Sequence, residues 1–193
     1  FSNYPYGLAS DGTDLFAAMS SYNSGSGSSI QFNRITLQTG TGGTNMVTPY
    51  TTGGENLGYM NGMEKIGDSF FTLSSNKIYE IGLTSATVST VPLSGTDNST
   101  SNYYERMTSS GDVLYLSGSS SGSSTMFSPV FSVSLGIADN GSTTGVLTQI
   151  NPTVTAASYY NTGSEVSLQY FYDFTADGSA VYVSDRYNKL IRK

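Results

Sequence analysis

Short apolar segments, each introduced by a glycine turn, recur along this chain. The shared pattern is a glycine, two variable residues, then Leu, Phe or Val, then Phe or Tyr. Its four copies are Gly12–Phe16, Gly67–Phe71, Gly111–Tyr115 and Gly178–Tyr182. A tight turn followed by a short apolar strand, repeated in this way, is typical of a β-propeller. Because one such sheet cannot bury both its faces alone, each copy implies a neighbouring sheet.

The first copy shows the full order of elements that the pattern predicts. Asp11-Gly12 between apolar residues is a strong hairpin signal. Apolar residues then alternate through residues 30–37 with one slip, which predicts a β-bulge there. The expected strands of this copy are Tyr6–Ser10, Leu15–Ala18, Ile30–Leu37 and Thr44–Thr48.

The other copies repeat this order, so we expect an all-β protein with about four propeller blades in a single region, 1–193. The predicted blades cover residues 4–52, 57–96, 103–153 and 168–193. The last copy stops before a fourth strand, and nothing before Tyr6 would close a ring. Since natural sheets avoid bare edges, we expect the region to belong to a larger propeller, incomplete at both ends, or to be covered by another subunit. No apolar period of 3.6 residues predicts a helix.

Composition narrows the class of partner. Charged residues make up 11% of the chain against roughly 25% in an average soluble domain, and the net charge is −6. So few basic residues cannot follow a phosphate backbone, which argues against nucleic acid as a partner. No apolar run approaches the ~20 residues that span a bilayer. The low charge and the abundance of Ser, Thr, Gly and Tyr predict a protein that is extracellular or on the cell surface. Because the chain begins at Phe1 rather than Met, we also expect a processed product.

The final segment, Ala180–Lys193, resembles the core of an NHL repeat, in which a strand of the type LYVAD is followed by Asn and an IRK strand. Pro5–Gly12 is similar to the opening strand and turn of that family, and Leu37–Gly40 and Leu83–Val91 are similar to its outer strand. The Asp of the family motif is present only as Asp185. The aligned residues of the other copies are Met19, Ser74 and Gly118.

The resemblance implies a propeller, commonly six-bladed, that serves as a rigid platform for contacts with proteins, peptides or nucleic acids. Some propeller enzymes similar to this family depend on histidine, either as a zinc ligand or as a base. This chain has no His and no Cys, so it offers neither that chemistry nor a thiol nucleophile.

Carboxylates leave one catalytic alternative open. Lactonase-type propellers bind calcium or a related cation through Glu, Asn and Asp on the central channel, and several acidic residues here lie near the starts of predicted inner strands. These residues are Glu55, Glu64, Glu105, Glu165 and Asp173. Solvated carboxylates on the rim are the simpler interpretation, because carboxylates are mostly exposed. Asp11, Asp112 and Asp177 are expected to form turns.

Two sequons, Asn98-Ser-Thr100 and Asn140-Gly-Ser142, fall in predicted loops and are candidate N-glycosylation sites. Tyr pairs at Tyr103-Tyr104 and Tyr159-Tyr160 form a candidate interaction surface, since Tyr buries a ring while keeping a polar tip. Packing between blades is the competing role for these tyrosines.

We therefore expect a non-enzymatic β-propeller module, without a cofactor or bound metal, that acts by surface contact. Its setting would be adhesion, a matrix, an appendage or a filament, and its partners would be proteins, through self-association or an adjoining chain, with glycans attached. One alternative is a metal-dependent lactonase- or hydrolase-like enzyme that uses channel carboxylates. The other is a monomeric propeller that recognises peptides or carbohydrates.

Overall fold

The chain forms β-strands throughout the part that the structure describes. The computed structural model describes residues 3–23, 27–36, 46–50, 53–54, 57, 60–74, 76–84, 87–95, 102–120, 129–150, 171–185 and 189–193. Within these ranges there are 17 strands and no helix. The all-β prediction is therefore confirmed. Accordingly, no helix among the described residues is long and apolar enough to cross a membrane.

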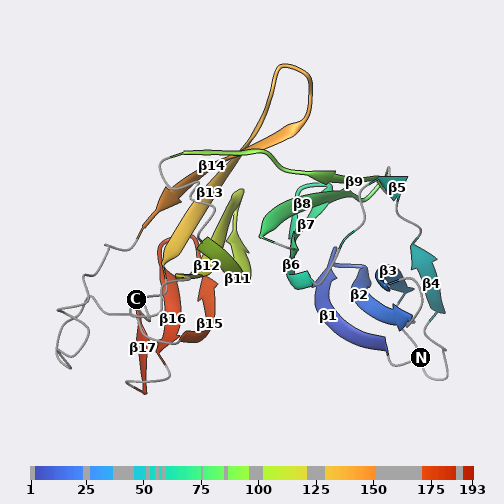
Figure 1. The fold of residues 1–193 in the computed structure, drawn as a ribbon, viewed down its shortest axis with the longest axis horizontal. Coiled ribbons are helices and arrows are strands. Elements are labelled where there is room, and N and C mark those ends of the chain that lie inside the picture. The colour runs from blue at the N-terminus through green and yellow to red at the C-terminus, as the bar shows by residue number, and fades with distance from the viewer. Residues whose placement is uncertain are drawn as a thin grey trace. The chain divides into compact units, whose positions relative to one another are not determined.

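The strands form four sheets, each built around a meander of strands that follow one another in sequence (Figure 1). Sheet 1 has the order β1–β2–β3–β4, and all of its strand pairs are antiparallel. Its strands are β1 (Asn3–Ser10), β2 (Asp14–Asn23), β3 (Gly27–Thr36) and β4 (Met46–Tyr50). This sheet falls within the first predicted blade, 4–52, apart from its first residue.

Sheets 2 and 3 each add a fifth strand to the meander. Sheet 2 has the order β5–β9–β8–β7–β6, and sheet 3 has the order β10–β14–β13–β12–β11. The strands of sheet 2 are β5 (Gly53–Gly54), β6 (Met60–Ile66), β7 (Ser69–Ser74), β8 (Lys77–Gly82) and β9 (Thr87–Thr90). The strands of sheet 3 are β10 (Leu93–Gly95), β11 (Asn102–Ser110), β12 (Val113–Ser120), β13 (Val130–Ile137) and β14 (Thr143–Gln149).

The fifth strand has the same place in both sheets. β5 pairs in parallel with β9, and β10 pairs in parallel with β14. In each case the segment that leads into a meander lies along the last strand of that meander and covers its edge. Covering an edge in this way protects it from pairing with another chain.

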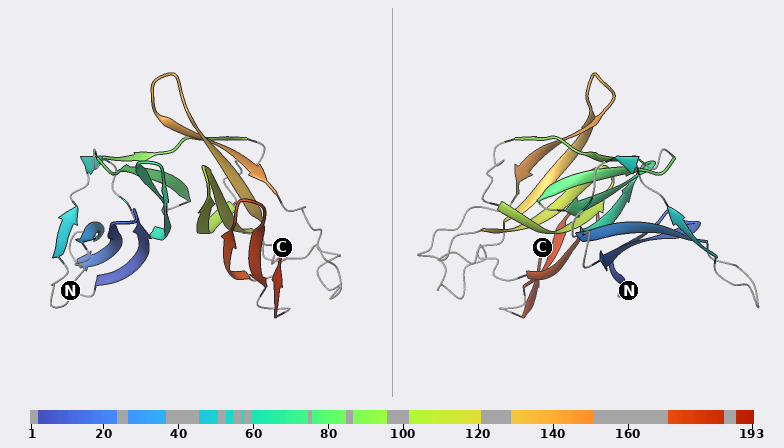
Figure 2. Two further views of the ribbon diagram at one scale, coloured as in Figure 1. Left: turned by 180° about the vertical axis from the view of Figure 1, so that it is seen from behind. Right: turned by 45° about the vertical axis from the view of Figure 1, so that its right-hand side comes forward.

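Sheet 4 has three described strands in the order β15–β16–β17 (Figures 1 and 2). They are β15 (Phe171–Ala176), β16 (Val181–Asp185) and β17 (Leu190–Arg192). The chain divides into two compact units, Phe1–Val91 with sheets 1 and 2, and Pro92–Lys193 with sheets 3 and 4.

The repeated glycines form the turn between the first and second strands of each meander. Gly12, Gly67, Gly111 and Gly178 have φ values of 92°, 55°, 58° and 86°. These values lie in the left-handed region, where a side chain is strained and glycine is not. The recurrence of glycine at this position thus has a direct cause in the backbone.

The bulge predicted within residues 30–37 is not present, because β3 pairs with both β2 and β4 without a register shift. The slip in the hydrophobic pattern has another origin. Phe32 and Asn33, on opposite faces of the strand, are both buried, while Arg34 is exposed. The apolar positions therefore change face along a regular strand, and a buried Asn occupies one core position.

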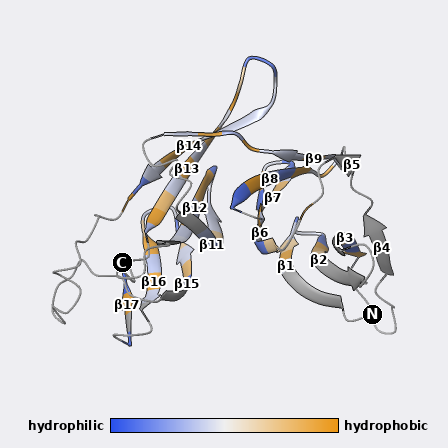
Figure 3. Ribbon diagram, in the orientation of Figure 1, coloured by the Kyte–Doolittle hydropathy of each residue, from blue (hydrophilic) through white to orange (hydrophobic). Residues whose placement is uncertain are grey.

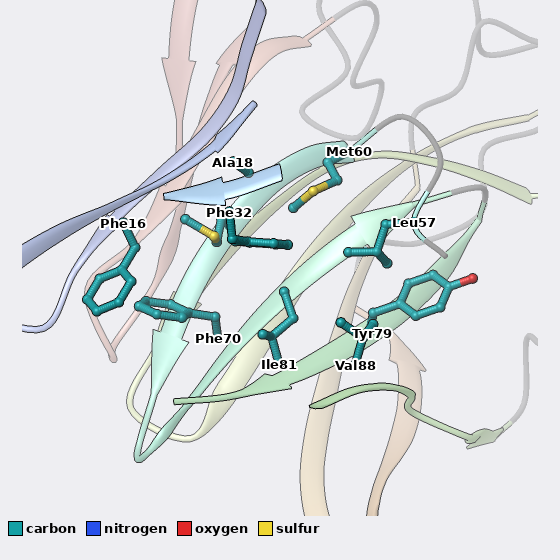
Figure 4. Packing of buried hydrophobic residues seen from close by; sticks show 10 residues of the cluster. Phe16, Ala18, Phe32, Leu57, Met60, Phe70, Tyr79, Ile81 and Val88 are labelled. Carbon is teal, nitrogen blue, oxygen red and sulfur yellow. The ribbon is translucent and has the colours of Figure 1, made fainter. Parts of the chain in front are cut away.

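The core of the first unit lies between sheets 1 and 2. Phe16, Ala18 and Phe32 of sheet 1 pack in one cluster with residues from one face of sheet 2 (Figure 4). The rings of Phe16 and Phe70 lie 4.6 Å apart between centroids, with their planes at 53°. The sheet 2 members of the cluster and the preceding loop residue are Leu57, Met60, Met63, Phe70, Tyr79, Ile81 and Val88.

Among the described residues of the second unit, most of the buried ones belong to sheet 3. Leu114 and Leu116 of β12 lie opposite Val133 and Phe131 of β13, and all four are buried. The turn of sheet 4 lies against sheet 3, since a Cβ on Gly178 would come 3.3 Å from the hydroxyl oxygen of Ser110.

Candidate functional site

A β-bulge recurs in the first strand of every meander (β1, β6, β11 and β15), at the same distance from the repeated glycine. In each case three steps along the first strand face two steps along the second, so that one residue is inserted. The shifts lie between Pro5 and Gly7, Met60 and Met63, Tyr104 and Arg106, and Phe171 and Phe174. Bulges are frequent beside functional sites because they redirect side chains out of the ladder.

The residues at these bulges, called the bulge pairs below, differ from sheet to sheet. They are Tyr6–Gly7, Asn61–Gly62, Glu105–Arg106 and Tyr172–Asp173. The side chains of Asn61, Glu105, Arg106 and Asp173 are exposed. One backbone device therefore presents an amide, a carboxylate beside a guanidinium, and a second carboxylate at equivalent places.

Hydroxyl groups on the second strand hold the bulge in two of the sheets. A bulge leaves backbone groups without a ladder partner, and such groups need another hydrogen bond. In sheet 2 the Thr72 hydroxyl donates to the Gly62 carbonyl at 2.8 Å. In sheet 4 the Ser184 hydroxyl accepts from the Asp173 N–H at 3.0 Å and donates to the Asp173 carbonyl at 2.9 Å. The bulges are thus fixed parts of the framework.

Of the five candidate carboxylates, three lie in the described part of the chain. Glu105 and Asp173 belong to the bulge pairs, whereas Glu64 is half-buried in β6 and lies opposite Phe71. Glu55 and Glu165 lie outside the described residues. Within the described ranges, no group of three or more His, Cys, Asp or Glu side chains is placed to hold a metal ion.

All three expected turn-forming aspartates lie in turns: Asp112 follows Gly111 in the turn between β11 and β12, and Asp11 and Asp177 also accept hydrogen bonds there. Asp177 Oδ1 accepts from the N–H groups of Ser179 and Ala180 at 2.9 and 3.0 Å, and from the Ser179 hydroxyl at 2.7 Å. The Tyr182 hydroxyl donates to Asp177 Oδ2 at 2.9 Å. These hydrogen bonds hold the pKa of the Asp177 carboxyl well below its usual range, and the bond from the Ser179 hydroxyl has the largest effect. Hydrogen bonds from the N–H groups of Asp14 and Thr13 likewise lower the pKa of Asp11.

The candidate glycosylation site Asn140 lies at the tip of the β13–β14 hairpin. The hairpin projects from its sheet in both views, and its tip is hydrophilic (Figures 2 and 3). Asn140 is exposed, and its Oδ1 accepts from the N–H of Ser142 at 3.0 Å and from its hydroxyl at 2.6 Å. Asn98 lies outside the described residues.

The tyrosine surface needs a correction at Tyr104. Its side chain is 7% exposed, and its ring meets that of Phe131 edge-on at 5.6 Å. Tyr104 therefore packs against Phe131 within sheet 3 and does not present its ring to solvent. Tyr103 lies in β11, but its side chain is outside the described set, and Tyr159 and Tyr160 lie outside the described residues altogether.

Sequence reasoning missed a polar side-chain pair that occurs at equivalent positions within sheet 1 and within sheet 2. Asp14 is buried and forms an ion pair with Arg34, whose Nε donates to Asp14 Oδ2 at 2.7 Å. At the equivalent positions of sheet 2 the Ser69 hydroxyl donates to Glu80 Oε1 at 2.6 Å. Both pairs join the second strand to the third diagonally, and this cross-strand relation becomes visible only once the register is known.

Comparisons with known proteins give no match: no family model matches the chain, and no curated protein does either.

Proposed function

We propose that this chain is a β-propeller module that acts by surface contact, outside the cell or on its surface, as a structural or adhesive platform. The observation that carries the proposal is the repeated bulge. Sheets 2, 3 and 4 present different side chains from the same backbone device, with Asn61, Glu105 and Asp173 exposed. A framework repeated with variable display is suited to recognition, since its contacts are spread over many positions.

The direction in which side chains point within each sheet supports the propeller. In sheet 1 the residues four and six positions after the repeated glycine, Phe16 and Ala18, face sheet 2. In sheet 2 the residue three positions after the glycine, Phe70, faces sheet 1. Sheets 1 and 2 thus meet through opposite faces of the repeat, which is the arrangement that stacked propeller blades require.

Polar, weakly charged surface chemistry supports the extracellular setting. The chain has 11% charged residues, against roughly 25% in an average soluble domain. The exposed Asn140 at a projecting hairpin tip is the place where an attached glycan would meet no core packing. We include N-glycosylation at Asn140 in the proposal, to be checked by loss of a glycosidase-sensitive mass shift in Asn140→Gln when the chain is secreted from eukaryotic cells.

A calcium titration of the melting temperature separates this proposal from the hydrolase alternative. A contact module without a structural cation should show the same Tm with calcium and with a chelator. Glu64→Gln and Glu105→Gln should leave that insensitivity unchanged, and Glu80→Gln, whose carboxylate accepts from Ser69, serves as the matched control. A rise in Tm with calcium that only the Glu64 or Glu105 variant removes would refute the proposal and favour the metal-dependent enzyme.

A further inference from the structure

Leu8 is exposed at a position that is buried in every other sheet. Register places it opposite the residue five positions after the repeated glycine, and the equivalent residues are Met63, Met107 and Phe174. Leu8 is 61% exposed, whereas the other three are 5%, 7% and 7% exposed. Among the described residues, this position is therefore buried in three sheets and exposed in sheet 1, although Ala17 and Asn33, which share the Leu8 face in the inner strands, are buried.

In sheet 4, Ile191 is likewise exposed at a position that is buried in the other three sheets. It lies opposite the residue six positions after the glycine, and its equivalents in the third strands are Phe32, Ile78 and Val130. Ile191 is 79% exposed, whereas these residues are 2%, 0% and 3% exposed. Sheet 4 thus has a core position on the face that would meet a following sheet.

These two kinds of position meet each other inside the chain. Phe32 of sheet 1, equivalent to Ile191, packs in the same cluster as Met63 of sheet 2, equivalent to Leu8. The approach is close, since a Cβ on Gly7 would come 2.9 Å from the Cβ of Met63. The exposed face of sheet 4 and the exposed face of sheet 1 are therefore complementary by the packing rule that the chain itself uses.

We propose that a second copy of this chain covers these faces, so that the Ile191 face of sheet 4 in one copy packs against the Leu8 face of sheet 1 in the next. The inference rests on the proposed function, whose stacked sheets it continues across molecules. Leu15 and Ile35, half-buried on the Leu8 face, would extend the apolar contact. The two faces differ, so the interface is head-to-tail, and copies either close a ring or continue as a filament. Two copies would supply eight sheets, within the range of known propellers.

A pair of charge substitutions tests this directly on the full chain. Sedimentation velocity should show the wild-type chain, 20.4 kDa as a monomer, associating as its concentration rises. Leu8→Glu and Ile191→Glu should each be monomeric, because one of the two faces is lost. Their mixture should form a dimer and nothing larger, since one intact face remains on each partner. Ile137→Glu, at an exposed position of β13 outside both faces, should associate like the wild type.

Several outcomes would overturn the inference. A wild-type chain that stays monomeric at all concentrations would do so, and if Leu8→Glu then lowered its Tm, the two faces meet within a single molecule. Single variants that associate as strongly as the wild type, or that fail to complement each other on mixing, would also refute it. A monomer whose Tm is insensitive to calcium removes the self-association alone, whereas a calcium-stabilised monomer removes the proposed function as well.

Discussion

The packing of sheet 1 on sheet 2 can be measured through one aromatic pair. Phe16 and Phe70 are 3% and 1% exposed and come from different sheets, with ring centroids 4.6 Å apart. Each Phe→Leu change should lower the free energy of unfolding by roughly 1–2 kcal/mol, because it removes buried volume without exposing a polar group. Tilted aromatic pairs at this distance contribute about 0.5–1.5 kcal/mol beyond the area they bury.

We therefore expect a coupling free energy of about 0.5–1 kcal/mol between Phe16→Leu and Phe70→Leu in a double-mutant cycle. The assay is urea unfolding followed by tyrosine fluorescence, with the free energy taken from the midpoint at a common slope. Phe71 provides a matched control, because it is equally buried in the same strand but points to the opposite face of sheet 2.

Phe16→Leu and Phe71→Leu should be additive within about 0.3–0.5 kcal/mol. A coupling of Phe16 with Phe71 that equals or exceeds its coupling with Phe70 would refute the assignment of faces. The packing rule drawn from those faces would then be lost as well.

Two further predictions concern close backbone approach and pH. Gly7→Ala should lower the free energy of unfolding, measured by urea unfolding, by about 1–3 kcal/mol, because the added Cβ would lie 2.9 Å from the Cβ of Met63. The control is Gly136→Ala, whose Cβ would have its nearest atom at 3.8 Å and which should change this free energy by less than about 0.5 kcal/mol. Equal effects of the two substitutions would contradict the close approach of Gly7 to Met63. The lowered pKa of Asp177 means that its turn contributes stability above the ordinary carboxyl pKa and loses it as the pH falls through the folded-state pKa. Its carboxyl ¹³C signal should therefore stay that of the ion between about pH 5 and pH 3, with Tyr182→Phe raising the pKa, and an ordinary titration would contradict this.

The turns and strands were predictable because their causes are local. Gly67 and Gly111 have positive φ, as their recurrence before apolar pairs implies, and the predicted strands Tyr6–Ser10 and Leu15–Ala18 lie within β1 and β2. The short strand β5 was not predictable, since two glycines carry no alternation and their pairing with β9 is a long-range contact.

The bulges and the cover of each face depend on register, which a single sequence does not display. The slip near Asn33 predicted a bulge in the wrong strand, because a buried polar residue imitates an inserted one. The bulge at Tyr6–Gly7 leaves no such trace, since both residues suit an ordinary strand end. Likewise, Leu8 and Met63 look alike in sequence, and only their pairing partners identify them as the same position.

An engineered cysteine pair gives the most direct test of the stacking on which this account depends. The chain has no native cysteine, and the Cβ atoms of Gly7→Cys and Met63→Cys would start 2.9 Å apart, about 0.6 Å short of the roughly 3.5–4.5 Å that a disulfide requires, so a small separation of the two strands brings them into range. Oxidation of the double variant should form a disulfide within one molecule, seen as the loss of both free thiols without formation of a covalent dimer. If both thiols stay free, or if the bond forms only between molecules, sheets 1 and 2 do not stack as described.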